Sequence, residues 1–498
     1  MNKFQRNMKR LVFLISVFFG ITVANAQNSD FPLMFSQYGM NGTATFIGKG
    51  GAIGALGGDI MSAHYNPAGL GMYRSSEFTY SMGLDMNSTK SKYNGLTGKD
   101  SHPSFNYGNL GLVLDFNNGK KSSWKHVQLS FGVNRLMNFN NRIKVTRKGL
   151  NRSFIDANYV NYYDADGNGI LDNGFAVSDA DRDDFFQAGV LSVDDERNIY
   201  SEFFNGDFDQ IIAYRESGYL NEFSMSVSGN YKNWIYLGAT VGIPFGSYTA
   251  KYMFSEHVNN ENGEGKYNYN TEQDLSVTGF NLKLGAIVKP VSFWRIGGAI
   301  HTPTFYSVDD DFYQEVSFTN VAGGWLSPIS YRMQSPWRFI ASTAFVFGNN
   351  KSPISGTLSV DYEYADYSFM SFDMDDDISS ETNLNSIIEN TYSGASNIRI
   401  GGELKMDKLY LRAGYAYYGS PYESKSNNDA SWNYITCGLG FRGKICNFDL
   451  AYAYGKQKSK YYVYDEYDPS TATWSADASP TEVTRNKHLI QATIGFKF

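Results

Sequence analysis

The residues with the clearest potential for chemistry lie in an acidic segment near residue 170. Oxygen-bearing side chains occupy positions 1, 3, 5 and 9 of a calcium-loop pattern and a glycine occupies position 6; these residues are Asp164, Asp166, Asn168, Asp172 and Gly169. Position 12, where a calcium loop has a bidentate glutamate, is Phe175, so an acidic residue of the 179–184 stretch would have to replace it. The pattern predicts a Ca²⁺ site in a surface loop, and a turn rich in Asp, Gly and Asn is the alternative. No other cofactor is predicted.

A basic tract precedes this acidic segment. Five basic residues follow one another without an intervening acid, namely Arg142, Lys144, Arg147, Lys148 and Arg152. If the tract is helical, Lys144, Lys148 and Arg152 share one face. Such a face suits the phosphates of lipopolysaccharide or the carboxylate of an incoming ligand. A solvated charged surface is the alternative interpretation.

The spacings typical of enzyme sites do not occur. The six histidines form neither HExxH nor another paired-ligand motif; they are His64, His102, His126, His257, His301 and His488. No GxSxG nucleophile elbow is present. The glycines of residues 48–51 resemble a phosphate-binding loop only superficially, because they do not lie between a strand and a helix and no GK[ST] follows. We therefore predict no catalytic residues and a protein that is not an enzyme.

The composition favours a protein that crosses a membrane with strands. The 498 residues include 37 Tyr, 36 Phe and 49 Gly, which suits strands with aromatic girdles. The mean hydropathy is −0.38 and no long apolar run follows the first 26 residues, which argues against membrane-spanning helices. The formal net charge of −7 gives no electrostatic reason to expect a nucleic-acid partner.

Residues 1–26 have the pattern of a secretory signal peptide. Basic residues up to Arg10 precede an apolar stretch, 11–23, that is too short to span a bilayer as a helix. The sequence Ala24-Asn25-Ala26 fits a cleavage site, so the mature chain would begin at Gln27. An uncleaved anchor helix is the alternative.

Apolar and polar residues alternate in many later segments. In the last eleven residues one face carries Ile490, Ala492, Ile494, Phe496 and Phe498 and the other carries Gln491, Thr493, Gly495 and Lys497. Successive strand residues point to opposite faces, so one face suits lipid and the other a hydrated lumen. Fourteen such strands are predicted, beginning near residues 76, 106, 125, 221, 234, 273, 293, 337, 354, 397, 409, 431, 446 and 487.

Short and long connections alternate between these strands. Bacterial barrels have an even number of strands, short periplasmic turns and longer extracellular loops. We therefore predict an all-β fold for residues 76–498: a 14-stranded antiparallel transmembrane β-barrel in the bacterial outer membrane. Its largest extracellular loop would be residues 137–220, which contain the basic tract and the acidic segment.

A glycine-rich segment ahead of these strands carries a family resemblance. It reads GGAIGALGGDIMSAHYNPAGLG and contains Asn66-Pro67-Ala68. With the supporting segments IGGAIHTPT, SPWRF and LRAGYAYYGSP, the chain resembles the FadL/TodX (OMPP1) family of outer-membrane transporters of hydrophobic compounds, and most of all its Bacteroidetes-like versions. The resemblance extends over essentially the whole mature chain.

The resemblance implies a plugged barrel. Residues 27–75 would be an N-terminal hatch inside the lumen, and Asn66, Pro67, Ala68 and Gly69 would form its gate. Proline fixes φ and asparagine bonds nearby backbone, which suits a tight irregular segment, although an ordinary Asn-Pro turn is the alternative. In the family, ligand leaves laterally at a kink in strand 3. Here Gly132 is the residue of that strand best able to bend.

Passive uptake of long-chain fatty acids or similar hydrophobic molecules follows from the same resemblance. Expected partners are a hydrophobic small molecule, outer-membrane lipid and lipopolysaccharide, and we expect a monomer. One departure is that the family builds its outer ligand groove from the loops after strands 5 and 7, whereas the largest loop here follows strand 3. The alternatives are a binding or adhesion protein or a haem receptor that uses its long loops, and a barrel enzyme that acts on lipid.

Overall fold

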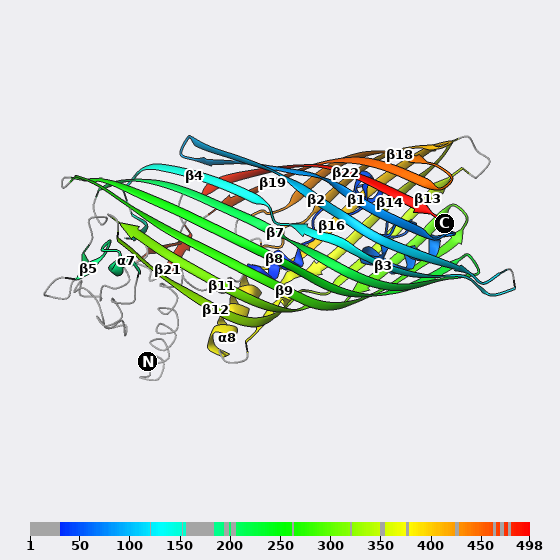
Figure 1. Cartoon of the computed structure of the whole chain (residues 1–498), viewed down its shortest axis with the longest axis horizontal. Coiled ribbons are helices and arrows are strands. Elements are labelled where there is room, and N and C mark those ends of the chain that lie inside the picture. Colours follow the sequence, from blue (N-terminus) through cyan, green and yellow to red (C-terminus); the bar gives the residue numbers. More distant parts are fainter. Residues whose placement is uncertain are drawn as a thin grey trace, which may run out of the picture.

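The computed structural model describes residues 30–119, 121–151, 153–155, 184–193, 199–200, 206–260, 263–318, 321–348, 354–374, 378–423, 428–461, 465–468, 473–476 and 480–498. Its main sheet has 18 strand segments, and fourteen of them form the wall of a closed antiparallel barrel (Figure 1). These wall strands are β1 (Glu77–Tyr93), β2 (Leu96–Asn117), β3 (Trp124–Asn138), β7 (Asp207–Tyr231), β8 (Ile235–Asn260), β9 (Gly263–Val291), β10 (Trp294–His301), β13 (Arg338–Phe347), β14 (Ile354–Asp366), β16 (Gly394–Met406), β17 (Leu409–Tyr418), β18 (Trp432–Arg442), β19 (Cys446–Tyr461) and β22 (Thr481–Lys497). The predicted fold class is confirmed.

Antiparallel pairing closes this wall. Each wall strand pairs with the next wall strand along the chain, and β22 returns to β1 with Lys497 opposite Glu77. Lipid offers no hydrogen-bonding partners, so a closed wall without edges is the arrangement in which strands can cross a bilayer.

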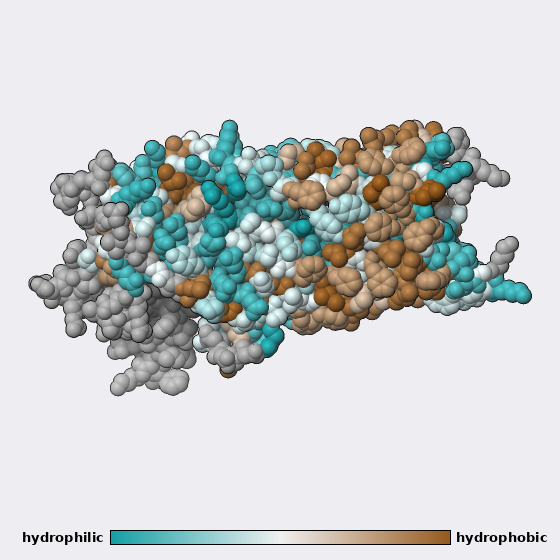
Figure 2. All heavy atoms as spheres, in the orientation of Figure 1, coloured by the Kyte–Doolittle hydropathy of each residue, from teal (hydrophilic) through white to brown (hydrophobic). Residues whose placement is uncertain are grey.

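An apolar belt surrounds one half of the barrel. On β9, for example, Leu282 and Leu284 are 42% and 57% exposed, whereas Lys283 between them is 1% exposed. Brown apolar residues cover the right half of Figure 2 and teal polar residues dominate the left half. A closed barrel with such a belt is the architecture of a protein that spans the bacterial outer membrane, with the polar half beyond the bilayer.

The polar half is built from strands that continue far beyond the belt. β7, β8 and β9 have 25, 26 and 29 residues. Four further segments extend the sheet there: β4 (Asn141–Leu150), β11 (Phe305–Phe318), β12 (Val321–Gln334) and β15 (Ser371–Asp373). Ser307, Asp309 and Asp311 on β11 are exposed, so this outer face meets water and not lipid.

The structure corrects the predicted loop 137–220. β3 ends at Asn138, β4 extends the same run of chain, and β7 begins at Asp207, so a large part of this range is strand. The starts of β2 and β9 were also predicted too late, because above the belt the outer face is polar and the apolar alternation disappears. The same region contains the basic tract, which is a strand and not a helix.

Several small elements lie outside the main sheet. They are α7 (Asp184–Gln187), α8 (Ile378–Thr391), η4 (Tyr367–Phe369), and the two-stranded sheets of β5 (Ser192–Val193) with β6 (Ile199–Tyr200) and of β20 (Asp465–Asp468) with β21 (Thr473–Ala476). No helix in the described ranges has the length and apolar character needed to cross a membrane.

The first described residues lie inside the barrel. Residues 30–75, here called the luminal segment, appear as the blue ribbon enclosed by the strands in Figure 1. The segment contains α2 (Phe31–Ser36), α3 (Ala44–Gly48), α4 (Ser62–Tyr65) and the 3-10 helix η2 (Pro67–Met72). Nearly all of its side chains from Met40 to Gly71 are buried, so it fills the lumen at the level of the belt.

Candidate functional site: the luminal segment and the wall around it

Asn66 organises the turn between α4 and η2. Its side-chain oxygen accepts a hydrogen bond from the Ala68 amide at 3.2 Å, and its side-chain nitrogen donates to the Gly54 carbonyl at 2.7 Å. Pro67 follows as the first residue of η2, where its missing N–H costs nothing. Gly69 continues the turn, and its carbonyl accepts from the Gly58 amide at 3.0 Å. The predicted gate residues therefore form one locally bonded unit.

This unit rests on glycines of the wall. Gly238 on β8 and Gly285 on β9 are directly opposite each other, and an added Cβ would overlap Pro67 at the first and Asn66 at the second. Gly297 on β10 lies against the Gly54 carbonyl in the same way. Only glycine permits such a close approach of two backbones. Residues 66–68 are thus seated on β8 to β10, and not chiefly on strand 3 as the resemblance implied.

The opposite side of the luminal segment rests on a second glycine set. Added Cβ atoms at Gly401 on β16 and Gly414 on β17 would overlap the backbone of residues 49–50. Gly438 on β18 approaches Gly48 closely as well. The Gly48 carbonyl also accepts a hydrogen bond from Thr436 Oγ1 at 3.3 Å. The luminal segment is therefore held between two walls.

A buried ionic cluster joins the luminal segment to the first wall. Glu222 on β7 forms an ion pair with Lys283 on β9, and its Oε1 lies 3.0 Å from His64 Nδ1 on α4. Lys283 Nζ is 3.2 Å from the same His64 nitrogen. Asn281 donates to Glu222 Oε2 at 3.1 Å. All four side chains are at most 1% exposed, so these contacts form in a dry environment where they are strong.

A second buried cluster centres on Glu363 of β14. Arg338 of β13 and Arg399 of β16 contact its two carboxylate oxygens at 2.5 and 2.9 Å. The guanidinium groups also stack over luminal rings, Arg338 over Tyr38 at 4.2 Å and Arg399 over Tyr65 at 4.8 Å. The charged side chains expected to face a hydrated lumen are therefore desolvated and paired against the luminal segment.

An internal cavity of about 650 Å³ lies between the luminal segment and the polar half of the barrel. Its lining is mixed: aromatic and aliphatic groups such as Phe31, Leu33, Phe139 and Tyr248 lie among many polar and charged residues, which include Arg338 and Arg399. Such a lining suits a ligand with an apolar body and a polar or anionic end. Tyr38 and Tyr65 form part of the boundary between this cavity and the two ionic clusters.

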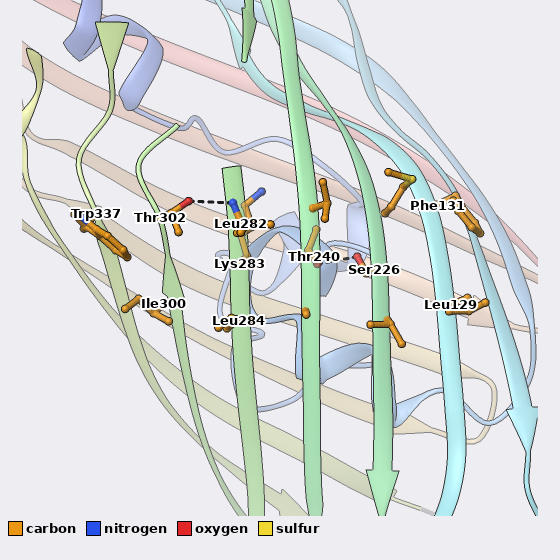
Figure 3. A pocket seen from close by; sticks show the side chains of 14 residues that line it. Leu129, Phe131, Ser226, Thr240, Leu282, Lys283, Leu284, Ile300, Thr302 and Trp337 are labelled. Carbon is orange, nitrogen blue, oxygen red and sulfur yellow. Dashed lines mark hydrogen bonds between the residues drawn. The ribbon is translucent and has the colours of Figure 1, made fainter. Parts of the chain in front are cut away.

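A second, shallow groove of about 520 Å³ lies on the outer surface of the belt. Figure 3 shows its side chains in a row across β3, β7, β8, β9 and β10, with Trp337 at one edge. Almost all of its surface is apolar, from residues such as Phe131, Leu282 and Leu284. Its polar lining residues are Ser226, Thr240, Thr302 and Lys283, and Lys283 turns its amine inward to Glu222.

Glu256 and Asp310 are buried carboxyls in the polar half. Glu256 accepts hydrogen bonds from the Phe154 amide at 3.0 Å and from Gln210 at 2.6 Å, and burial raises its pKa. Asp310 accepts from Gln273 at 3.0 Å and from the Tyr331 hydroxyl at 3.1 Å, and burial raises its pKa to about 6. The cause is the same in both, because the low-dielectric surroundings penalise the charged form.

The remaining predicted site residues are not brought together. Gly132 lies in an uninterrupted part of β3, opposite Gly111 on β2 and Ser224 on β7; the nearest register shift is between Arg135 and Met137. Its role in a lateral opening stays a prediction. Asp164, Asp166, Asn168, Asp172 and Arg152 lie outside the described residues. Within the described ranges no three His, Cys, Asp or Glu side chains could hold a metal ion.

The basic tract is divided between two faces of β4. Lys144 and Lys148 are exposed and Arg142 is half-buried, whereas Arg147 points inward. Arg147 is 2% exposed, stacks over the Tyr93 ring at 4.4 Å and donates to Gln210 at 3.1 Å. Strand alternation therefore removes one of the five charges from the predicted surface patch.

The sequence did not identify the residues that join the luminal segment to the wall. Glu222, Lys283 and Glu363 lie at lumen-facing positions of the alternation, which is the one signal that pointed to them. From the sequence, charges at these positions are expected to face a hydrated lumen, and only the packing of the luminal segment against the wall shows that they are paired.

Together, the closed belt and the filled lumen define a transmembrane β-barrel with an internal plug-like segment. No protein-family model matches the chain, and no curated protein matches it. Among solved structures, a FadL homologue of Pseudomonas aeruginosa is similar with a TM-score of 0.53 at 12% identity, covering 93% of this chain and 100% of that one. The toluene transporter TodX of P. putida is similar with a TM-score of 0.53 at 11% identity, covering 93% and 99%. The chain thus has the fold of FadL- and TodX-type outer-membrane channels.

Proposed function

We propose that the protein is an outer-membrane channel for the passive uptake of long-chain fatty acids or similar hydrophobic molecules. The observation that carries this proposal is the internal cavity of about 650 Å³, which combines apolar side chains with Arg338 and Arg399. An alkyl chain would bury its surface against the aromatic groups, and a carboxylate would meet a guanidinium. The similarity of the fold to that of a toluene transporter agrees with a hydrophobic cargo.

The filled lumen supports a lateral route of release. Directly below the cavity the luminal segment is packed against the wall on both sides, so a ligand that travelled straight down would have to displace it. A hydrophobic molecule also gains more by entering the lipid than by entering the aqueous periplasm. We infer that the ligand leaves through the barrel wall and that Asn66, Pro67, Ala68 and Gly69 act as the gate, since they connect the plug to β8, β9 and β10.

A direct test compares uptake of a fluorescent long-chain fatty acid by whole cells that carry the wild-type protein or no barrel. Wild-type protein should raise uptake several-fold, and mass spectrometry of lipid extracted from the purified protein should identify a bound fatty acid or related compound. The double change Asn66→Ala and Pro67→Ala should alter the rate, because it removes the hydrogen bonds to Gly54 and Ala68 that hold the gate.

The control is Asn118→Ala, a substitution in an exposed turn that follows the end of β2. Surface expression and heat-modifiable gel mobility should stay normal in both variants. Equal uptake by cells with and without the barrel would contradict the transport proposal and would favour the adhesion or haem-receptor alternative, which none of these observations tests.

The polar half suggests the partners at the cell surface. Lys144 and Lys148 face outward above the belt, where lipopolysaccharide phosphates would lie, and we propose that they contact those groups. The Ca²⁺ site and the monomeric state likewise remain proposals from the sequence.

A further inference from the structure

Three prolines lie in one section of the wall, on both sides of β9. Pro244 is in β8, Pro303 separates β10 from β11, and Pro336 separates β12 from β13. Proline has no N–H to give to a ladder and is normally excluded from the interior of a sheet. Three of the 12 prolines of the chain thus occur in one section of the wall: Pro303 and Pro336 are opposite each other, and Pro244 lies across β9 from them.

Strand pairing is interrupted at each of these prolines. Between β8 and β9, Gly242 pairs with Asn281 and Phe245 with Thr278, but the two residues between them on each strand do not pair with each other and keep only the pairing on their other side, with β7 and β11. Beyond β9, residues 302–304 and 335–337 face each other outside the regular ladder, between His301–Arg338 and Phe305–Gln334. One backbone hydrogen bond joins them, from Ser335 N to Thr304 O at 3.0 Å. Side chains replace part of the ladder, since Leu282 N donates to Thr302 Oγ1 at 3.0 Å. The wall is therefore weakened here.

The outer groove lies immediately beside this weak section. Residues 239–241 of β8 and 282–284 of β9 line it, and these stretches end where the pairing stops. Thr302 and Trp337, from the two unpaired stretches, complete its edge (Figure 3). An apolar hollow at a gap in the ladder is a place where an alkyl chain can leave the wall and enter lipid without meeting water.

The ionic cluster lies directly behind the same section. Asn281, the β9 residue at which pairing with β8 stops before the gap, donates to both Glu222 and Thr304. Tyr38, which borders the internal cavity, packs edge-on against His64 at 4.9 Å between ring centroids. Tyr38, His64 and the Glu222–Lys283 pair therefore lie in sequence from the cavity to the groove.

We propose that the exit for the transported hydrophobic molecule is this section of wall, between β8 and β13, and that the Glu222–Lys283–His64 cluster holds it closed. The inference rests on the proposed function and places the exit away from Gly132. Glu222 ties β7 to β9 across β8, and His64 connects both to the luminal segment. When ligand in the cavity displaces Tyr38 and α4, His64 leaves the pair, the strands separate at the prolines, and the ligand passes into the groove.

The test locks the gap with a disulfide. Ile243 and Phe280 are the outward-facing residues of the unpaired stretch, opposite each other by continuation of the register on both sides. They are changed to cysteine in a background in which the two free cysteines, Cys437 and Cys446, are alanine. The matched control is Leu404→Cys with Leu411→Cys, an outward-facing opposed pair on β16 and β17 where the ladder is intact.

Fluorescent fatty-acid uptake is measured in oxidised and reduced cells. The oxidised gap pair should lose most of its uptake and recover it on reduction, while the control pair should transport equally in both states. Heat-modifiable mobility and non-reducing mass spectrometry report folding and bond formation. An oxidised gap pair that transports like the control would overturn the exit site. If the parent barrel itself adds no uptake, the transport function fails instead.

A second variant tests the same inference without a disulfide. Pro244→Val returns a backbone donor to the gap and should lower uptake severalfold, whereas Pro328→Val in β12, above the belt, should leave it unchanged. Uptake that is equal in the two proline variants and in the parent would contradict a gate at the proline section.

Discussion

The two walls that hold the luminal segment differ in how their strands are joined. On one side, β14 to β19 pair through their full common length without a register break, and these strands contain no proline. On the other side, the ladder between β8 and β9 is interrupted at Pro244, and the ladder between residues 302–304 and 335–337 is interrupted at Pro303 and Pro336. Both walls approach the plug through glycines, so close contact alone does not distinguish them.

This difference separates two functions: one wall holds the luminal segment in place, and the other wall can open locally. A wall with an intact ladder can anchor the plug, because every strand resists movement through its neighbours. A wall with missing ladder bonds can yield locally at low cost, because fewer hydrogen bonds must be broken. The structure thus assigns anchoring to β14–β19, and the proposed exit to the interrupted side.

The largest effect is expected at Glu363, which joins the two walls through Arg338 and Arg399. Glu363→Gln leaves two buried guanidinium groups without their counter-ion, which should cost about 3–5 kcal/mol of unfolding free energy. Urea unfolding of the purified barrel in micelles, followed by heat-modifiable mobility, measures the loss. Asp373→Asn is the control, because its pair with Arg332 is more than half exposed and should matter far less. Equal losses would show that the buried cluster does not join the walls.

Substitution of inward-facing glycines should give the next largest loss of stability, and it compares the two walls directly. Gly401→Ala and Gly285→Ala each place a methyl group on the luminal segment, and overpacking of this kind costs about 1–3 kcal/mol. We expect the larger loss of stability for Gly401→Ala, where the ladder is intact, and altered uptake for Gly285→Ala, where the wall can yield. Gly402→Ala and Gly298→Ala are the controls, since their added Cβ meets nothing closer than 3.7 Å. The reverse order of stabilities would contradict the comparison.

The smallest effect is expected in the β11–β12 hairpin, which extends the interrupted wall into the polar half, and it is a pH dependence of protease sensitivity. The pKa of Asp310 is raised to about 6, above its ordinary value, because burial penalises its charge. A carboxyl whose pKa is higher in the folded state stabilises that state while protonated, and this contribution is lost as the pH rises through 6. The β11–β12 hairpin should therefore be cleaved faster by proteinase K at pH 8 than at pH 5, after correction for the activity of the protease.

Asp310→Asn should abolish this pH dependence, because the amide stays neutral across the range. Asp311→Asn is the matched control, since Asp311 is the next residue and is exposed. An unchanged pH dependence in Asp310→Asn would assign the effect to another group.

Within the belt, the sequence predicted the strands closely. Alternation of apolar and polar residues located β1, β3, β8, β14, β17 and β19 within a residue or two, because lipid demands an apolar outer face at every second position. Above the belt that demand ends, and so the upper parts of β7 and β9 and the whole of β4 were missed. The basic tract was misread for the same reason, since Arg147 turned out to be an inward residue of a strand.

The sequence by itself determined the class of fold, the number of wall strands and the family resemblance, since these depend on local alternation and on short motifs. Only the tertiary structure decided which wall the Asn66–Gly69 unit contacts, which charges are paired, and that three prolines far apart in the chain lie in one section of the wall. Those features depend on register between strands separated by many residues. Register is fixed by closure of the whole barrel around the luminal segment, so it cannot be predicted from a local sequence pattern.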